Sequence, residues 1–194
     1  MSANNLKILG FSGSMRRESL NRKLILSAAD CIRKTGVEVN IVEFSDLQMP
    51  MYDTDLQEQN GFPENVSKFR DLVKEHNGFF ISTPEYNHSI SPLLKNALDW
   101  ASRSEGGEPL GFLFKGKAAL MLSAAPGIYG GVRALIHLRE ILSALGLQVL
   151  PRQLALSRAK SAFNENNEFK DSNIEKEVTY LGESLVELSL SLEK

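Results

Sequence analysis

The chain has 194 residues, of which 42% are hydrophobic and 24% are charged, and its net charge is -2. These values are close to those of ordinary globular proteins and exclude collagen-like, disordered and membrane-embedded classes. The near balance of basic and acidic residues disfavours a protein that binds nucleic acid through its charge. The single cysteine, Cys31, excludes a disulfide framework within the chain. We therefore expect residues 1–194 to form a single domain with its own apolar core.

Nothing in the sequence indicates export or insertion into a membrane. The apolar runs are shorter than the roughly 18 residues that a spanning helix needs. Residues 1–5 are polar, and the apolar run after them lacks the basic region and the cleavage site of a secretory signal. We therefore expect a cytoplasmic protein without a membrane span.

Short apolar runs alternate with amphipathic stretches, and these patterns indicate buried strands and helices respectively. In chain order they predict a strand at 6–12, a helix at 19–34, a strand at 37–44, a helix with Pro63 at its first position, a strand at 78–82, a helix at 92–102, a strand at 117–123, a helix at 134–145, a strand at 147–150 and a helix at 174–192. Three connections differ from short turns. We expect a long polar link at 45–62, a mobile Gly-rich loop at 104–109 and an irregular segment at 151–170.

The predicted strands are almost wholly apolar, which is typical of a parallel sheet covered by helices on both faces. We expect an α/β fold with a doubly wound five-stranded sheet in the order 2-1-3-4-5. In this order the switch point lies between the first and third strands, and ligands bind beyond the carboxyl ends of the strands there. The loops after the first, third and fourth strands should therefore meet at one ligand.

The first of these loops runs from Ser12 to Asn21 and leads from a buried strand into a helix. Free backbone N–H groups at the start of that helix favour an anion, and short polar side chains add further donors. Arg16 or Arg17 can form a forked pair with a phosphate, and the spacing alone does not choose between them. The sequence also predicts Ser19 as the N-cap of this helix, and that role is compatible with phosphate binding.

Two other phosphate motifs are absent or misplaced. The sequence has no G-x-G-x-x-G, which is the fingerprint of dinucleotide binding. Residues Gly111 to Lys117 match G-x-x-x-x-G-K, but Ala118 stands where a Ser or Thr would hold magnesium, and the run precedes a strand. We therefore expect Lys115 and Lys117 to be solvated residues at the start of a strand.

The loop after the third strand, 82–89, offers a flat ligand several contacts. Pro84 restricts the backbone, Tyr86 supplies an aromatic face, and Asn87 supplies both donors and acceptors. These groups suit the edge of a heterocycle. The alternative is an ordinary turn into a helix that Ser89 or Ser91 caps.

The loop after the fourth strand, 123–131, contains three glycines, which allow a ligand to approach the backbone closely. A flexible turn between strand and helix is the alternative. Neither His88 nor Cys31 suggests chemistry of its own. We expect His88 at the surface or at a cap, and Cys31 in the core because it falls near the apolar face of its helix.

Motifs in the first two loops resemble those of a known family. The chain reads Gly13-Ser14-Met15-Arg16-x-x-Ser19-x-Asn21, then Pro84-Glu85-Tyr86-Asn87, then Leu94-Lys95-Asn96-Ala97-Leu98-Asp99-Trp100. In this order, the motifs are similar to those of the NADPH-dependent FMN reductases, flavodoxin-like flavoproteins that include quinone, azo-dye and chromate reductases. The resemblance covers residues 6–150. Met15 replaces the Leu of the family's first motif.

The resemblance implies a role for each loop. The FMN phosphate would be held by Ser12, Ser14, Arg16, Ser19, Leu20 and Asn21. The isoalloxazine would be lined, largely through backbone groups, by Pro84, Glu85, Tyr86 and Asn87. Its other side would be closed by Ser123 and Gly127, and residues 49–52 would border the substrate space. No metal and no catalytic acid, base or nucleophile is expected, because the flavin carries the redox chemistry.

The implied activity is that of an oxidoreductase with bound FMN. NADPH or NADH would reduce the flavin and leave before a small-molecule electron acceptor binds, which is a ping-pong mechanism; quinones, azo dyes and chromate are candidate acceptors. The resemblance also implies a homodimer or homotetramer, with the helices at 92–100 and 133–145 as candidate surfaces. The alternatives are a flavodoxin-type electron carrier that does not oxidise NAD(P)H, and a scaffold protein that has lost the flavin.

Overall fold

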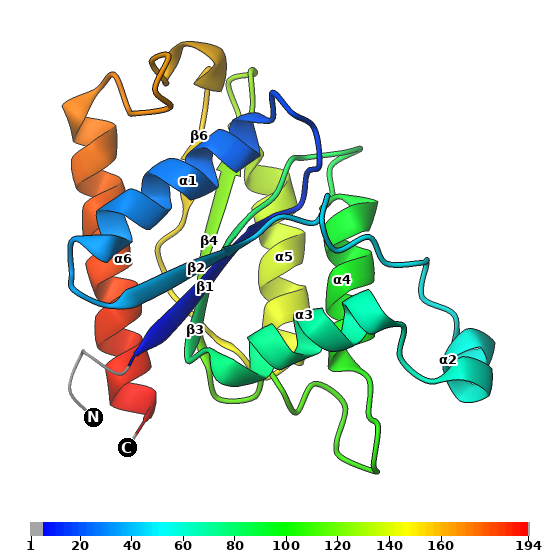
Figure 1. Cartoon of the computed structure of the whole chain (residues 1–194). Helices are drawn as coiled ribbons and strands as arrows, with labels where there is room; N and C mark the ends of the chain where they lie inside the picture. The colour runs from blue at the N-terminus through cyan, green and yellow to red at the C-terminus, as the bar shows by residue number, and fades with distance from the viewer. Residues whose placement is uncertain (1–5, 194) are drawn as a thin grey trace.

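The computed structural model describes residues 6–193 and contains a six-stranded parallel sheet between two layers of helices (Figure 1). In chain order its elements are β1 (Lys7–Ser12), α1 (Leu20–Arg33), β2 (Glu38–Val42), α2 (Thr54–Asn60), α3 (Glu64–Glu75), β3 (Gly78–Ser82), α4 (Pro92–Ser102), β4 (Ala118–Ala124), α5 (Val132–Ala144), β5 (Gln148–Val149), β6 (Leu154–Leu156) and α6 (Ser172–Leu192). A short 3-10 helix at Ala159–Ser161 lies between β6 and α6.

The sheet has the doubly wound order expected from the sequence. Its strands follow β2-β1-β3-β4-β5, and every pairing is parallel. Helices α1 and α6 cover one face, and α3, α4 and α5 cover the other (Figure 1). Ser12 pairs with Ser82, so β1 and β3 end at the same level and deliver their loops to one edge of the sheet.

The sheet divides the apolar core into two halves. Ile8 and Phe80 point toward α1 and α6, whereas Leu9 and Phe79 point toward α3, α4 and α5. A Cβ at Gly10 would overlap the ring of Phe80, so a side chain at this position is excluded. Because both faces of the central strands are buried, these strands read as continuous apolar runs rather than alternating ones.

The sixth strand corrects the expectation that residues 151–170 are irregular. β5 pairs with Ala118 and Ala119 at the start of β4, and β6 pairs with the last three residues of β4. The fifth position of the sheet is therefore filled by two short strands in succession. Pro151 lies between them and has no N–H for the ladder, which explains why a single continuous run is not visible in the sequence.

A short helix, α2, lies in the segment 45–62, where the sequence predicts only a polar link. Asp53 caps it by accepting hydrogen bonds from the backbone N–H groups of Asp55 and Leu56. No residue of α2 is buried, so it has no apolar periodicity to reveal it. The helix projects beside α3 and α4 (Figure 1). Pro63 occupies the N-cap of α3, one position earlier than expected.

The polar loop at 104–109 is closed by its own carboxylate. Glu108 accepts hydrogen bonds from the backbone N–H groups of Gly106 and Glu105 and from the hydroxyl of Ser104. These donors, the N–H of Gly106 first, lower the pKa of Glu108 to about 2. The loop therefore has a defined turn that its composition does not reveal.

Lys117 is not the solvated residue that we expect from the sequence, whereas Lys115 is exposed as predicted. The ammonium group of Lys117 donates hydrogen bonds to the carbonyl oxygens of Val73, at 2.5 Å, and Lys74, at 3.0 Å. Burial lowers the pKa of Lys117 to about 8. The physical reason is its place at the start of β4, next to the last carbonyls of α3, which attract a cation.

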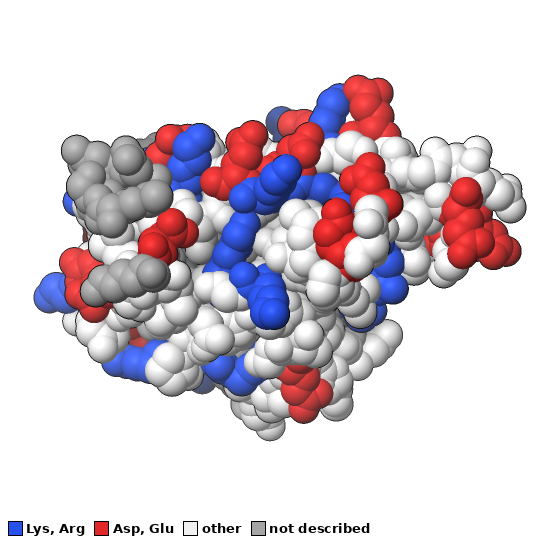
Figure 2. Space-filling view, turned by 90° about the horizontal axis from the view of Figure 1, so that it is seen from below, with Lys and Arg blue, Asp and Glu red and all other residues white. Residues whose placement is uncertain are grey.

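The face at the amino ends of the strands carries charges of both signs. Figure 2 shows this face from below, with basic and acidic side chains interspersed among uncharged ones. None of the helices between residues 6 and 193 combines the length and the hydrophobicity that a membrane span requires.

Candidate functional site

Three loops meet at the carboxyl ends of β1, β3 and β4. We call them loop one (13–19), loop two (83–91) and loop three (125–131). The backbone N–H of Gly13 donates to the carbonyl of Ser82, at 2.8 Å, and that of Thr83 donates to Leu122, at 3.1 Å. The N–H of Ala125 in loop three donates to Leu156 of β6, at 3.1 Å. Each loop is thus tied to the neighbouring strand, as the sheet order predicts.

Asn21, in the first turn of α1, joins this helix to the ends of β3 and β4. Its amide nitrogen donates to the carbonyl of Ala124, and its amide oxygen accepts from the N–H of Ala124 and the hydroxyl of Ser82. The residue is only 2% exposed. The amide oxygen is saturated and one N–H donor remains, so the amide chiefly sets the position of α1 relative to β3 and β4.

Loop one and the start of α1 form a cradle of hydrogen-bond donors. Ser19 is the N-cap of α1 and accepts from the backbone N–H of Arg22. Ser14 is buried and accepts from the N–H of Arg16 at 3.4 Å. The hydroxyl of Ser12 is buried and has no hydrogen-bond partner among residues 6–193. An unpartnered buried hydroxyl beside a helix N-terminus fits an anion such as a phosphate.

The two arginines of loop one differ in position. Both are exposed, but only Arg16 lines a depression of about 360 Å³, whose walls also include Met15, Tyr86 and Leu93. This depression joins loop one to loop two and to the first turn of α4. Leu20 is half-buried and packs against the core beneath α1.

Loop two contains a tight turn. Tyr86 and Ser89 exchange two backbone hydrogen bonds, at 2.9 and 3.0 Å. Between them, Asn87 and His88 have φ angles of 48° and 67°, which is the left-handed pair of a type I′ turn. The turn leaves Tyr86 45% exposed beside the depression. Pro84 enters the turn half-buried.

Helix α5 holds loop two from one side. The guanidinium of Arg133 forms an ion pair with the carboxylate of Glu85, at 2.5 Å, and contacts Nε2 of His88, at 3.0 Å. One turn later, Nδ1 of His137 contacts the hydroxyl of Ser89, at 2.9 Å. The prediction that His88 lies at the surface is confirmed, since its side chain is exposed. Sequence reasoning did not connect Arg133 with Glu85, because 48 positions separate them.

Loop three packs closely against its neighbours. Ser123 is fully buried and donates to the carbonyl of Thr83, at 2.7 Å, so its side chain supports loop two from below. Gly131 has a φ of 89°, and a Cβ there would overlap the hydroxyl of Ser123. Gly127 is exposed with open space around its Cα, and its carbonyl accepts from the N–H of Arg158.

Ser91, not Ser89, caps α4, which decides between the two candidates that the sequence leaves open. Its hydroxyl accepts from the N–H of Leu94 and donates to the carbonyl of Gly13, at 2.6 Å. The cap therefore joins loop one to loop two. The signal in the sequence is a serine immediately before Pro92, because proline favours the first position of a helix.

Residues 49–52 run along α4, one turn beyond the depression. The carbonyl of Pro50 accepts from the side-chain amide of Asn96 and from the indole N–H of Trp100, each at 2.8 Å. The N–H of Tyr52 donates to Asn96, at 2.7 Å. Trp100 is fully buried, so it packs within the core of this chain.

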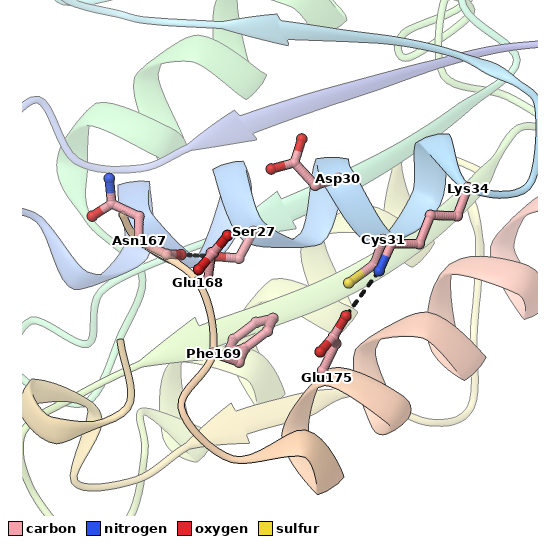
Figure 3. A pocket seen from close by; sticks show the side chains of 8 residues that line it. All are labelled: Ser27, Asp30, Cys31, Lys34, Asn167, Glu168, Phe169 and Glu175. Carbon is pink, nitrogen blue, oxygen red and sulfur yellow. Dashed lines mark hydrogen bonds and ion pairs between the residues drawn. The ribbon is translucent and has the colours of Figure 1, made fainter. Parts of the chain in front are cut away.

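A separate pocket of about 430 Å³ lies between α1, α6 and residues 167–169 (Figure 3). Its polar groups bind one another: Lys34 pairs with Glu175 at 2.8 Å, and Ser27 donates to the carbonyl of Asn167. Cys31 is buried here, and burial raises the pKa of its thiol, so the core position predicted for it is confirmed. Among the residues that the structure describes, no group of His, Cys, Asp or Glu is arranged to hold a metal ion.

Known proteins with similar sequences and structures share one family. A family model described as NADPH-dependent FMN reductase matches residues 6–161. An NAD(P)H-dependent FMN reductase of Pseudomonas aeruginosa is 34% identical over 170 residues, which are 87% of each chain. A quinone reductase of Escherichia coli is 36% identical over 145 residues, which are 75% of this chain and 73% of that relative.

The solved structure of a flavoenzyme, the NAD(P)H:(acceptor) oxidoreductase from Paracoccus denitrificans, has the same fold. It superposes with a TM-score of 0.82 at 25% sequence identity, over 96% of this chain and 98% of that chain. Since the family model spans most of the sequence and the relatives match over most of their length, this chain belongs to the family of NADPH-dependent FMN reductases, which are oxidoreductases.

Proposed function

We propose that this protein binds FMN and transfers electrons from NADPH or NADH to a quinone or a similar small acceptor. The observation that carries the proposal is the buried hydroxyl of Ser12, which has no partner among residues 6–193 and lies at the end of β1, before the first turn of α1. A buried polar group without a partner costs free energy, and the terminal phosphate of FMN would supply that partner.

The donors of loop one would bind the phosphate. The free N–H groups at the start of α1 and the hydroxyls of Ser12 and Ser14 offer neutral hydrogen bonds. Arg16, which lines the depression, would add a forked, charge-assisted pair. Ser19 and Asn21 are occupied as cap and tie, so they would act by holding the cradle in place.

Loop two would line the isoalloxazine. Its type I′ turn presents Tyr86 to the depression and, with Glu85 and Asn87, to a neighbouring hollow of about 540 Å³. The first turn of α4 adds Pro92 to both and Leu93 to the depression. These groups orient a flat ring and exclude water from one of its sides. The chemistry that bound FMN would supply is hydride uptake from the nicotinamide and the transfer of two electrons to the acceptor. Loop three, with Gly127, would close the other end of the site.

The depression is open to solvent, which supports a ping-pong order of binding. An open face of the ring gives the nicotinamide and the acceptor the same place to stack, so one must leave before the other enters. Initial rates at several concentrations of both substrates should then give parallel double-reciprocal lines. Lines that intersect would contradict a single shared face. Quinones, azo dyes and chromate are to be compared as acceptors in this assay.

An absorption spectrum of the purified protein, followed by anaerobic addition of NADPH or NADH, tests the proposal. We expect bound FMN whose visible absorption is bleached by the nicotinamide and restored by a quinone. A protein that binds FMN but is not bleached would be an electron carrier of the flavodoxin type. A protein that binds no FMN would contradict the proposal.

We also propose a homodimer or homotetramer. Loop three and α5 expose apolar side chains at Ile128, Tyr129 and Ile136, which are 65%, 61% and 53% exposed. They lie on one helix and the loop that precedes it, so they can be buried together by a second copy. Light scattering at micromolar concentration should give a multiple of the 21.5 kDa chain mass, and Ile136→Glu should lower it. A wild-type particle of one chain mass would contradict the proposal.

A further inference from the structure

We propose that Arg133 is a positioning residue for electron transfer, because it fixes Glu85 of loop two and cancels the negative charge of that carboxylate beside the flavin ring. The inference rests on the proposed function and deepens it. It assigns a role to a residue of α5 that lies outside the phosphate cradle and outside the turn that lines the ring.

Arg133 contacts loops two and three at once. Its guanidinium pairs with Glu85 and contacts Nε2 of His88, and its backbone N–H donates to the second carboxylate oxygen of Glu85, at 3.2 Å. The guanidinium also lies over the ring of Tyr129 in loop three, 5.1 Å from its centroid. One side chain therefore sets the distance between the loops expected on either side of the ring.

Glu85 needs this partner because of where it lies. Its side chain is only 9% exposed, and the residue lines the neighbouring hollow next to Tyr86 and Asn87. This hollow shares Tyr86 and Pro92 with the depression. A carboxylate in such a place is poorly hydrated, so its charge is weakly screened. Within residues 6–193, Arg133 is the only basic residue that forms an ion pair with Glu85.

The position of Arg133 requires the geometry of a guanidinium as well as its positive charge. Its Nε is buried without a hydrogen-bond partner among the described residues, although Nη1 contacts His88 and Nη2 contacts Glu85. A lysine could supply the charge at this position but not the fork that reaches both Glu85 and His88. Arg133→Lys therefore separates the charge of Arg133 from its geometry.

The charge matters because reduction adds negative charge to the flavin ring. Without Arg133, the Glu85 carboxylate would oppose that charge, and the protein would bind reduced FMN less tightly than oxidised FMN. Without Glu85, the remaining guanidinium would favour reduced FMN. The midpoint potential of bound FMN should therefore move in opposite directions in the two single variants. A residue that only stabilises the fold would not produce this pattern.

The experiment measures the midpoint potential of FMN bound to the intact protein by equilibration with a reference dye. The variants are Arg133→Met, Arg133→Lys, Glu85→Gln and the double variant Glu85→Gln/Arg133→Met. We expect Arg133→Met to weaken the binding of reduced relative to oxidised FMN about tenfold, a shift of about 30 mV to lower potential for a two-electron couple. Glu85→Gln should raise the potential, and the double variant and Arg133→Lys should return close to wild type.

Arg152→Met is the matched control, because Arg152 forms an exposed ion pair with Glu177 of α6, away from the loops. It should leave the potential unchanged. Equal potentials for wild type, Arg133→Met and Glu85→Gln would overturn the proposal, even if the variants melt at lower temperature. If Arg133→Met does not fold, Glu85→Gln decides alone: an unchanged or lower potential overturns the inference. A wild-type protein that binds no FMN would instead contradict the proposed function.

Discussion

The side chain of Asn21 and the backbone of Ala124 exchange two hydrogen bonds of 2.9 Å, although 103 positions separate the residues. This pair joins the helix that follows β1 to the last residue of β4, so it aligns loop one with loop three. The third bond of the amide, from the hydroxyl of Ser82 at 2.7 Å, adds the end of β3. A single buried amide therefore joins the first turn of α1 to the strand ends from which loops two and three begin.

Replacement of Asn21 should destabilise the fold before it affects any ligand. Asn21→Ala leaves the N–H and carbonyl of Ala124 and the hydroxyl of Ser82 buried without partners, which we expect to cost about 2–4 kcal/mol of the free energy of unfolding. Urea unfolding of the flavin-free protein measures this loss. Asn65→Ala is the control, because its amide forms one exposed bond to Gln48. A change below about 0.5 kcal/mol for Asn21→Ala would show that the tie is unimportant.

Ser12 and Ser82 stand side by side at the ends of β1 and β3 but should respond differently to replacement by alanine. Ser12→Ala removes a hydroxyl without a partner, so the flavin-free protein should be as stable as wild type or slightly more stable. Its affinity for FMN should fall about tenfold or more, because a bond to a charged group is worth about 1.5–3 kcal/mol. Ser82→Ala breaks the bond to Asn21 and should cost about 1 kcal/mol without flavin.

Thermal unfolding without flavin and fluorescence titration with FMN measure these two effects. If the Ser12→Ala variant binds FMN as tightly as wild type, the assignment of this hydroxyl to the phosphate is wrong.

Arg16→Ala should weaken FMN binding roughly 10- to 150-fold, since a charge-assisted hydrogen bond is worth about 1.5–3 kcal/mol. Affinity for riboflavin, which has no phosphate, should barely change. Arg17→Ala is the matched control: Arg17 is exposed but is not part of the wall of the depression, so both affinities should stay the same. Quenching of flavin fluorescence by the flavin-free variants measures all four affinities. If Arg17→Ala and not Arg16→Ala causes the large loss of FMN affinity, Arg17 is the arginine that binds the phosphate.

His76 should make the fold less stable at acidic pH. It is 1% exposed, and burial lowers its pKa below the ordinary value of 6.5. Below about pH 6.5 the unfolded chain therefore binds a proton that the folded chain does not, and the free energy of unfolding falls as the pH falls toward the folded pKa. The slope contributed by one such group cannot exceed about 1.4 kcal/mol per pH unit.

Melting temperatures between pH 5 and 8 measure this dependence. His76→Gln should flatten the curve, whereas His137→Gln, at an exposed position, should leave it as in wild type. Parallel curves for wild type and His76→Gln would contradict the prediction.

Local patterns in the sequence predict most of the fold because they report burial directly. Strands buried on both faces must be apolar along their whole length, and helices on a sheet must repeat an apolar face, so β1, β3 and β4 are visible within one or two residues of their bounds. Parallel order and right-handed crossovers then place the three loops at one edge. The polar residues of loop one follow from the same reasoning, since a helix that begins there has free N–H groups.

The tertiary structure decided what depends on contacts between distant segments. β6 exists because the last residues of β4 offer an open edge, and α2 exists without any buried face, so neither leaves a periodic pattern in the sequence. Asn21 and Ser123 are predicted site residues by their position in the chain, and the structure shows that their side chains are ties between segments of these loops. In the sequence, nothing distinguishes Arg133 from other surface charges, and only the folded chain brings it into contact with Glu85. Hydrogen bonds and ion pairs between distant residues leave no repeating pattern in the sequence, because only the folded chain brings the two partners together.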